Sequence, residues 1–191
     1  MRKIVFALCL VLTLTATSMA TTLRSLDAGE LAQLADRIFA GEVLSVERAM
    51  DASQFRVMIV TVRVTEGIKN TYTGEIVVFK QIDEMIPGLP HYQAGEQVML
   101  FLAGVSRLGL TAPLGLGQGR FRLGGDQPGH EALVNDFQNE GLFHLSKALA
   151  RSEALSDGER RMVTQRRGPV ERQTFVRFIR REAAKEVVRE Q

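Results

Sequence analysis

The sequence predicts a mainly β fold: a small closed or partly open barrel of six to seven strands, with a leading helix and a C-terminal amphipathic helix. Three observations support this class. Phe55–Asn70 is a long β-branched stretch without proline, and shorter apolar stretches separated by turn residues follow it as far as residue 135. Apolar residues at helical spacing occur only near the two ends of residues 21–191. A two-sheet sandwich is the alternative architecture.

Phe55–Asn70 predicts the central strand. Its Val, Ile and Thr residues are stiff at χ1 and fit a pleated surface. Positions 58, 60, 62 and 64 are all apolar, and alternate residues share one face of a strand, so this face should be buried. The opposite face is apolar at its start and polar from Thr61 onward. A strand that is covered on both faces at one end and on one face at the other is typical of a curved sheet or barrel.

Residues 1–20 predict a signal peptide. Arg2 and Lys3 precede the apolar run Ile4–Leu14, and Ser18-Met19-Ala20 is the small-x-small pattern of a cleavage site. The expected location is therefore outside the cytoplasm, periplasmic or extracellular. A lone anchor helix is the alternative, but the run falls short of the ~20 residues that span a bilayer. No later stretch is long enough, so we expect no transmembrane segment after cleavage.

Residues 21–191 contain no cysteine, because the single cysteine is Cys9. Thiolate catalysis and cysteine-ligated metal sites are therefore excluded. The charge is uneven: residues 160–191 carry ten Lys and Arg against four Glu, whereas residues 21–159 carry twelve basic against eighteen acidic residues. A basic tail beside an acidic body predicts that the two touch or that the tail meets an anion, and a solvated helix face is the plainer alternative.

The domain after the leader should open with a helix over Leu26–Arg37. Asp27 and Glu30 have capping-box spacing, and apolar residues follow at helical intervals from Leu31 to Ile38. Ile38–Arg48 should then be extended, with a bulge or bend at Gly41.

Five shorter strands should follow the central one, and the first of them is apolar on both faces. A long connection, Ile82–Ala94, contains two prolines and should be irregular and exposed. The barrel domain with its leading helix would then occupy residues 21–141. The five predicted strands are Glu75–Gln81, Glu96–Ala103, Leu108–Ala112, Gln118–Leu123 and Glu131–Asn135.

Residues 142–191 predict a helical C-terminal segment, and whether it packs on the barrel is left open. Leu142, Leu145 and Leu149 begin the helical pattern, and Ser156–Gly168 should be mobile. Pro169 is expected in the first turn of the terminal helix. The apolar stripe of that helix is Val170, Phe175, Phe178, Ile179 and Ala183.

The order of motifs resembles a widespread and largely uncharacterised family of secreted bacterial proteins. The likeness lies in SLDAGELAQLADRIFAGEVLSVE (25–47), VTVRVTEGIKN (60–70), IPGLPHYQAGEQVMLFL (86–102) and GLGQGRFRL (115–123), and more weakly in ALVNDFQNEGLF (132–143). The resemblance implies an OB-like barrel, distantly similar to the tissue inhibitors of metalloproteinases, and a secreted zinc protease as partner. The inhibitory mechanism does not carry over, because those inhibitors present a disulfide-held N-terminal cysteine and this chain would begin at Thr21.

No catalytic, metal or cofactor pattern stands out. Gly115-Leu-Gly-Gln-Gly lacks the third glycine of a dinucleotide loop and precedes a strand. The three histidines, His91, His130 and His144, form no HxH or HExxH pattern. The pair Asp83-Glu84 offers too few oxygens for calcium.

The leading hypothesis is an exported, non-enzymatic binding module for a secreted protease or another envelope protein. One alternative is a hydrolase that uses His, Asp and Glu from the loops. A second is a protein that binds the envelope surface through its basic terminal helix; nucleic acid is not expected, because no aromatic residues alternate with the arginines. The oligomeric state is left open. The candidate partner contacts are Pro87, Pro90, His91, Tyr92, Gln118 and Arg120, and the candidate anion contacts are Arg172, Arg177, Arg180 and Arg181.

Overall fold

The computed structural model describes residues 24–52, 54–124, 131–144 and 155–187, so the predicted signal peptide lies outside it. Seven strands form one antiparallel sheet in the order β3-β2-β1-β4-β5-β6-β7, and the sheet is not closed. The mainly β class is thus confirmed. The strands are β1 (Arg37–Met50), β2 (Arg56–Lys69), β3 (Ile76–Ile82), β4 (Gln97–Leu102), β5 (Arg120–Gly124), β6 (Ala132–Asn135) and β7 (Val170–Glu171). The helices are α2 (Ala28–Leu34), α4 (Asp157–Thr164), α5 (Arg172–Val187) and the short 3₁₀ helix η1 (Leu116–Gln118).

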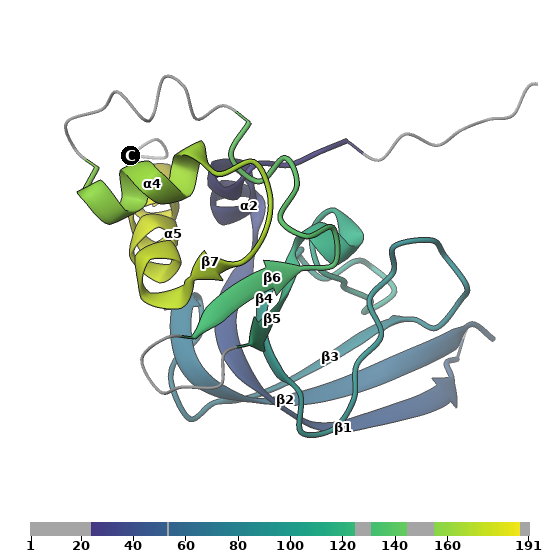
Figure 1. Cartoon of the computed structure of the whole chain (residues 1–191). Coiled ribbons are helices and arrows are strands. Elements are labelled where there is room, and N and C mark those ends of the chain that lie inside the picture. Colours follow the sequence, from purple (N-terminus) through teal and green to yellow (C-terminus); the bar gives the residue numbers. More distant parts are fainter. Residues whose placement is uncertain (1–23, 53, 125–130, 145–154, 188–191) are drawn as a thin grey trace, which may run out of the picture.

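The long β1–β2 hairpin extends away from the helices, which gather on one side of the sheet (Figure 1). The register of β1 against β2 shifts at three places, one of them between Ala40 and Gly41. These shifts bend the hairpin. Gly41 is required at the bend, because a Cβ there would collide with the carbonyl oxygen of Arg63 and lie 2.7 Å from Cγ1 of Val62. The bend predicted at Gly41 is confirmed.

The sheet separates two apolar clusters, which we call the inner core and the outer core. The inner core lies in the curl of β1 to β4 and includes Val60, Val62 and Val64. The outer core lies between the other face and the helices. Strand β4 contributes side chains to both cores: Leu100 is in the inner core, and Phe101 beside it is in the outer core. Since β4 is covered on both faces, its sequence is apolar without alternation.

Helices α2 and α5 cover the outer core. Asp27 and Glu30 form the predicted capping box at the start of α2. Phe175 of α5 packs on Phe121 of β5, with ring centroids 5.1 Å apart. Strand β7 also pairs with β6, so the chain beyond residue 142 shares one core with the strands before it. The terminal stripe is buried at all five positions: Val170, Phe175, Phe178, Ile179 and Ala183.

Three expectations about the strand region are wrong. Leu108–Ala112 is not a strand; the segment instead crosses from β4 to β3, where Thr111 N–H donates to the carbonyl of Lys80. Ile76 and Val78 are exposed, because they share a face with Arg63 and Thr61, whereas Val77 and Phe79 face the inner core. Helix α2 ends at Leu34, which is exposed, and Ile38 already belongs to β1.

Two further expectations fail near the C-terminus. Ser156–Gly168 contains α4, which begins with a second capping box formed by Ser156 and Glu159. Pro169 precedes β7 rather than opening the helix, because the next two residues pair with β6. Leu145 and Leu149 lie outside the described residues, as does His130. None of the described helices combines the length and the apolar composition that crossing a lipid bilayer requires.

Candidate functional site

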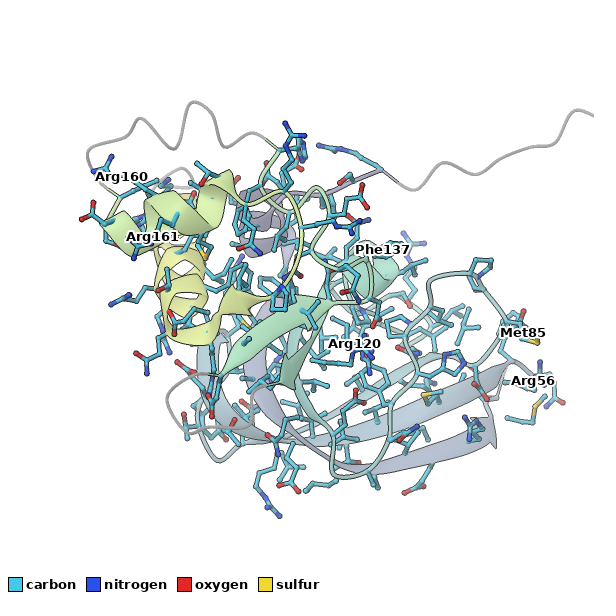
Figure 2. All side chains as sticks on the ribbon, in the orientation of Figure 1. Arg56, Met85, Arg120, Phe137, Arg160 and Arg161 are labelled. Atoms are coloured by element: carbon cyan, nitrogen blue, oxygen red, sulfur yellow. The ribbon has the colours of Figure 1, made fainter. Side chains whose placement is uncertain are left out.

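A cavity of about 830 Å³ lies at the open side of the sheet, between β5 and the connection from β3 to β4. Arg120 lies beside it, and Met85 is on the exposed part of the connection (Figure 2). The wall consists of Arg48, Gly88, Leu89, Pro90, His91, Tyr92, Gln93, Glu96, Arg120, Arg122 and Asp136.

The sheet itself explains why this cavity is polar. Residues paired across strands lie on the same face, and β5 pairs Arg120 with Leu100 and Arg122 with Val98 of β4. Leu100 and Val98 belong to the inner core. The two arginines therefore continue the inner face of the sheet, and the apolar surface ends where they begin.

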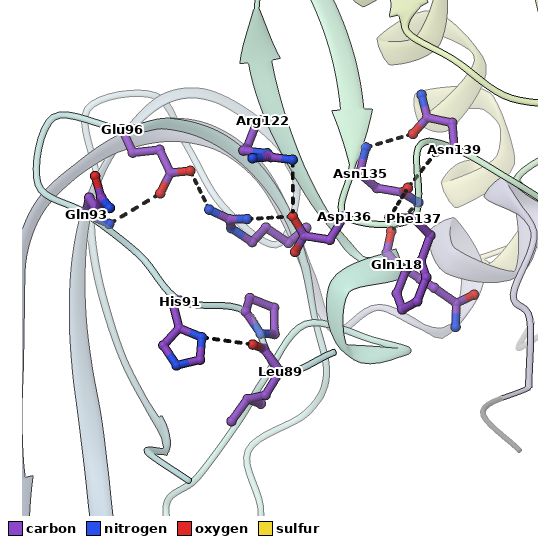
Figure 3. Close-up of polar contacts among 12 residues, drawn as sticks. Leu89, His91, Gln93, Glu96, Gln118, Arg122, Asn135, Asp136, Phe137 and Asn139 are labelled. Carbon is purple, nitrogen blue, oxygen red and sulfur yellow. Dashed lines mark hydrogen bonds and ion pairs between the residues drawn. The ribbon is translucent and has the colours of Figure 1, made fainter. Parts of the chain in front are cut away.

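Arg120 is the centre of the polar wall and is only 6% exposed. Its guanidinium donates to Asp136 Oδ1 at 2.8 Å and to Glu96 (Figure 3). Its Nε is buried and has no hydrogen-bond partner among the described residues. The cation is thus held between two carboxylates, which offset the cost of burying it.

Tyr92 joins the connection to the inner core. Its ring meets that of Phe79 on β3 edge to face, with centroids 5.6 Å apart. The hydroxyl is buried and unpartnered within the described chain, and burial raises the pKa of Tyr92. Gln81 on β3 donates to the carbonyl of Pro90 at 2.8 Å. The segment from Leu89 to Tyr92 therefore packs as a wedge beside β3, whereas the sequence suggested an exposed loop.

Arg48, Arg122 and His91 present polar groups at the mouth of the cavity. Arg48 Nε donates to Asp83 Oδ2 at 3.1 Å. Arg122 is 3.7 Å from Asp136 Oδ1, and its side chain is 47% exposed. His91 is exposed, and its Nδ1 lies 3.1 Å from the carbonyl oxygen of Leu89.

The cavity unites four of the six predicted partner contacts: Pro90, His91, Tyr92 and Arg120. Pro87 is exposed but is not part of the wall. Gln118 is buried, and its side chain is engaged within the molecule: Oε1 accepts from the N–H of Leu26, and Nε2 donates to the carbonyl of Arg24. It therefore holds residues 24–26 against η1 and is a structural residue.

Sequence reasoning missed four charged residues of the wall: Arg48, Glu96, Arg122 and Asp136. Glu96 precedes β4, and Asp136 follows β6. They meet only because both strands flank β5, so no local pattern in the sequence could have revealed the pairing with Arg120.

Five exposed apolar side chains lie on the segments that border the cavity: Met50, Phe55, Met85, Ile86 and Phe137. We call this group the apolar rim. Met50 and Phe55 flank the turn of the β1–β2 hairpin, and Asp83 N–H donates to the carbonyl of Arg56 beside that turn. Gly88 lies against the ring of Phe137, so the connection also touches the turn after β6. Met85 is 97% exposed, which is unusual for a methionine on an ordinary surface.

Of the two described histidines, neither joins a carboxylate in the cavity. No hydrogen bond links His91 to Glu96 or Asp136 within the described part of the chain. His144 lies near Asp27 and Glu30, where the three side chains could offer ligand atoms within 4.8 Å of one another. The two carboxylates already form the capping box, and Glu30 also pairs with Arg24. The hydrolase alternative stays a prediction.

The basic helix meets the acidic body of the same molecule. Arg172 pairs with Glu131 and, at 3.0 Å, with Glu66. Arg180 also contacts Glu66, and Arg181 donates to Glu159 at 2.7 Å. Arg177 is exposed and contacts the hydroxyl of Thr174. Three of the four predicted anion contacts are therefore ion-paired within the protein, as one of the two charge-based alternatives proposed.

Comparison of the chain with family models, with curated proteins and with solved structures finds no match. The resemblance to secreted bacterial proteins with an OB-like barrel therefore stays a prediction.

Proposed function

We propose that the protein is an exported, non-enzymatic binding module that docks a protein partner, a secreted protease or another envelope protein, with the end of the sheet that carries the cavity. The observation that supports this most is the apolar rim beside an arginine-lined cavity. Interfaces are enriched in aromatic residues, methionine and arginine, and their energy comes from a few such side chains. The rim supplies Met and Phe, and the cavity supplies the arginines.

Contacts within the molecule also hold this surface in place, so binding a partner would cost little conformational entropy. Gln81 holds Pro90, the ring of Tyr92 packs on Phe79, and Gly117 N–H donates to the carbonyl of Gly88 at 2.9 Å. These contacts fix the inner part of the connection, while Met85 and Ile86 remain exposed at its tip.

Site-specific photo-crosslinking tests the proposal. A benzophenone amino acid replaces Met85 in one variant and Tyr72 in the matched control. Tyr72 is also exposed, but it follows β2 at the end opposite the hairpin turn. We expect Met85 to yield one specific adduct in the exported fraction and Tyr72 to yield none.

The adduct's protein would then be purified and its affinity for the wild-type chain measured. Met85→Asp and Phe137→Asp should weaken that binding, since each puts a charge into an apolar contact. Equal crosslinking from the two positions, or unchanged affinity in both variants, would refute the proposed surface.

A further inference from the structure

The charges in the cavity wall leave two guanidinium groups with unused donors. Glu96 and Asp136 both bind Arg120. Arg122 shares Asp136 only through the 3.7 Å contact, its one ion pair within the described chain. Arg48 uses its Nε on Asp83, which leaves its terminal nitrogens without a hydrogen bond to the described residues. A guanidinium can bind a carboxylate through two parallel N–H groups, and such pairs are strong.

Two polar atoms inside the wall also lack hydrogen-bond partners. The Nε of Arg120 and the hydroxyl of Tyr92 are buried without a partner among the described residues. Native interiors leave few such atoms, and Nε of arginine can only donate. These two atoms have almost no accessible surface, so the donors that a ligand can reach are those of Arg48 and Arg122, whose side chains are 63% and 47% exposed. A ligand that brings acceptor oxygens matches these donors. A cationic ligand would face three arginines, and both carboxylates in the wall already serve Arg120.

The size of the cavity and its surroundings indicate where such an acceptor comes from. About 830 Å³ is far more than one carboxylate needs, so the site also has room for the chain that carries it. The apolar rim lies on the same segments that supply wall residues, and its exposed side chains would meet apolar neighbours on that chain. The arrangement fits an acidic side chain flanked by apolar residues better than a free small anion.

We propose that the cavity binds the carboxylate of an Asp or Glu side chain on a partner protein, held between the guanidinium groups of Arg48 and Arg122. This inference rests on the proposed function for the source of the carboxylate only. The chemistry of the site is a property of this chain, and it can be tested without the partner.

The test uses two capped tripeptides, acetyl-Leu-Glu-Leu-amide and acetyl-Leu-Gln-Leu-amide, titrated into ¹⁵N-labelled protein at neutral pH and low salt. We expect the glutamate peptide to shift the amide signals of residues 91–93, 120–122 and 136 and to saturate. The glutamine peptide should bind about tenfold more weakly or not at all, because it lacks the charge that strengthens the hydrogen bonds.

Arg48→Gln and Arg122→Gln should each weaken binding of the glutamate peptide by about tenfold. Both side chains are about half exposed or more, so the variants should fold, and a thermal melt checks this. Arg63→Gln is the matched control, since Arg63 is as exposed but lies on the other face of β2 from Val62.

Equal shifts from the two peptides, or full binding in both arginine variants, would overturn the inference. Acetate that binds as tightly as the glutamate peptide would show a general anion site and would overturn the assignment to a protein side chain. Peptide binding without a crosslink at Met85 would refute the proposed function alone. A crosslink without peptide binding would refute this inference alone.

Discussion

The guanidinium of Arg120 lies over the ring of Tyr92, with Cζ 5.2 Å from the ring centroid. Tyr92 meets Phe79 of β3 with the same ring. Tyr92 thereby links β3, an edge strand, to β5 through side chains, although these two strands are not paired with each other. Cation–π and aromatic contacts of this kind each stabilise by about 1 kcal/mol. The segment from Leu89 to Tyr92 thus covers the inner core between β3 and β5.

Arg120→Met should destabilise the protein by roughly 2–4 kcal/mol, because it leaves Glu96 without its ion-pair partner and Asp136 with only the 3.7 Å contact to Arg122. The cost stays below that of a fully buried charge, since water reaches both carboxylates. Urea denaturation at pH 7 measures it. Arg122→Met, at a half-exposed position, should cost under about 1 kcal/mol. Equal losses in the two variants would show that Arg120 does not hold this site together.

Tyr92→Phe should leave the free energy of unfolding unchanged or raise it by up to about 1 kcal/mol, because the removed hydroxyl is buried and has no partner in the described chain. Tyr92→Ala should cost about 3–5 kcal/mol through the loss of the ring and the cavity it leaves. Both values come from denaturant titration. A loss well above 1 kcal/mol in Tyr92→Phe would mean that the hydroxyl is hydrogen-bonded after all.

Val62→Asp should prevent the protein from accumulating. The side chain is fully buried in the inner core, and a carboxylate there has no partner, at a cost of several kcal/mol. A domain has only about 5–15 kcal/mol of stability in total. Thr61→Asp, one residue away on the partly exposed face, should be milder. The yield of soluble protein compares the two, and equal yields with equal melting midpoints would contradict the register described for β2.

Gly41→Ala should destabilise by about 1–3 kcal/mol, because the methyl group would overlap the backbone of Arg63 in the bend of the hairpin. Gly104→Ala provides the control, since nothing lies within 4 Å of a Cβ at that position. Chemical denaturation of both variants distinguishes them. If Gly41→Ala were as stable as the control, the close approach of β1 and β2 would be misplaced.

Glu159→Gln should lower stability at pH 7 by roughly 1–2 kcal/mol. Burial alone would raise the pKa of Glu159, but hydrogen bonds from Ser156 and Arg181 outweigh it and hold the pKa below its ordinary value of 4.5. The carboxylate therefore stabilises the fold above about pH 4.5, and this contribution disappears as the pH falls through the folded-state pKa. The difference between wild type and variant should shrink at pH 3.

Glu140→Gln, at an exposed turn position, is the control for that series and should match the wild type at both pH values. A gap between wild type and Glu159→Gln that stays constant from pH 7 to pH 3 would show that the ionised carboxylate is not what stabilises α4.

Local chemistry could be predicted from the sequence alone. The alternation from Met58 to Val64 determined which face of β2 is buried, because side chains alternate strictly along a strand. The spacing of Asp27 and Glu30 determined where α2 begins. The same spacing at Ser156 and Glu159 was present in the sequence and would have indicated α4, where we instead expected a mobile segment.

Only the tertiary structure decided what depends on distant partners. The apolar stretch Leu108–Ala112 is joined to its neighbours by single backbone hydrogen bonds, such as those from Thr111 to Lys80 and from Ala103 to Ala112, rather than by a ladder, so it is not a strand. Val78 is exposed because it shares a face with its partner Thr61, the face of the β2–β3 pair opposite the inner core. Arg120, Glu96 and Asp136 form one site because β5 lies between β4 and β6. Which charges meet is set by strand order, and strand order follows from how the whole chain buries its apolar surface, which no single stretch encodes.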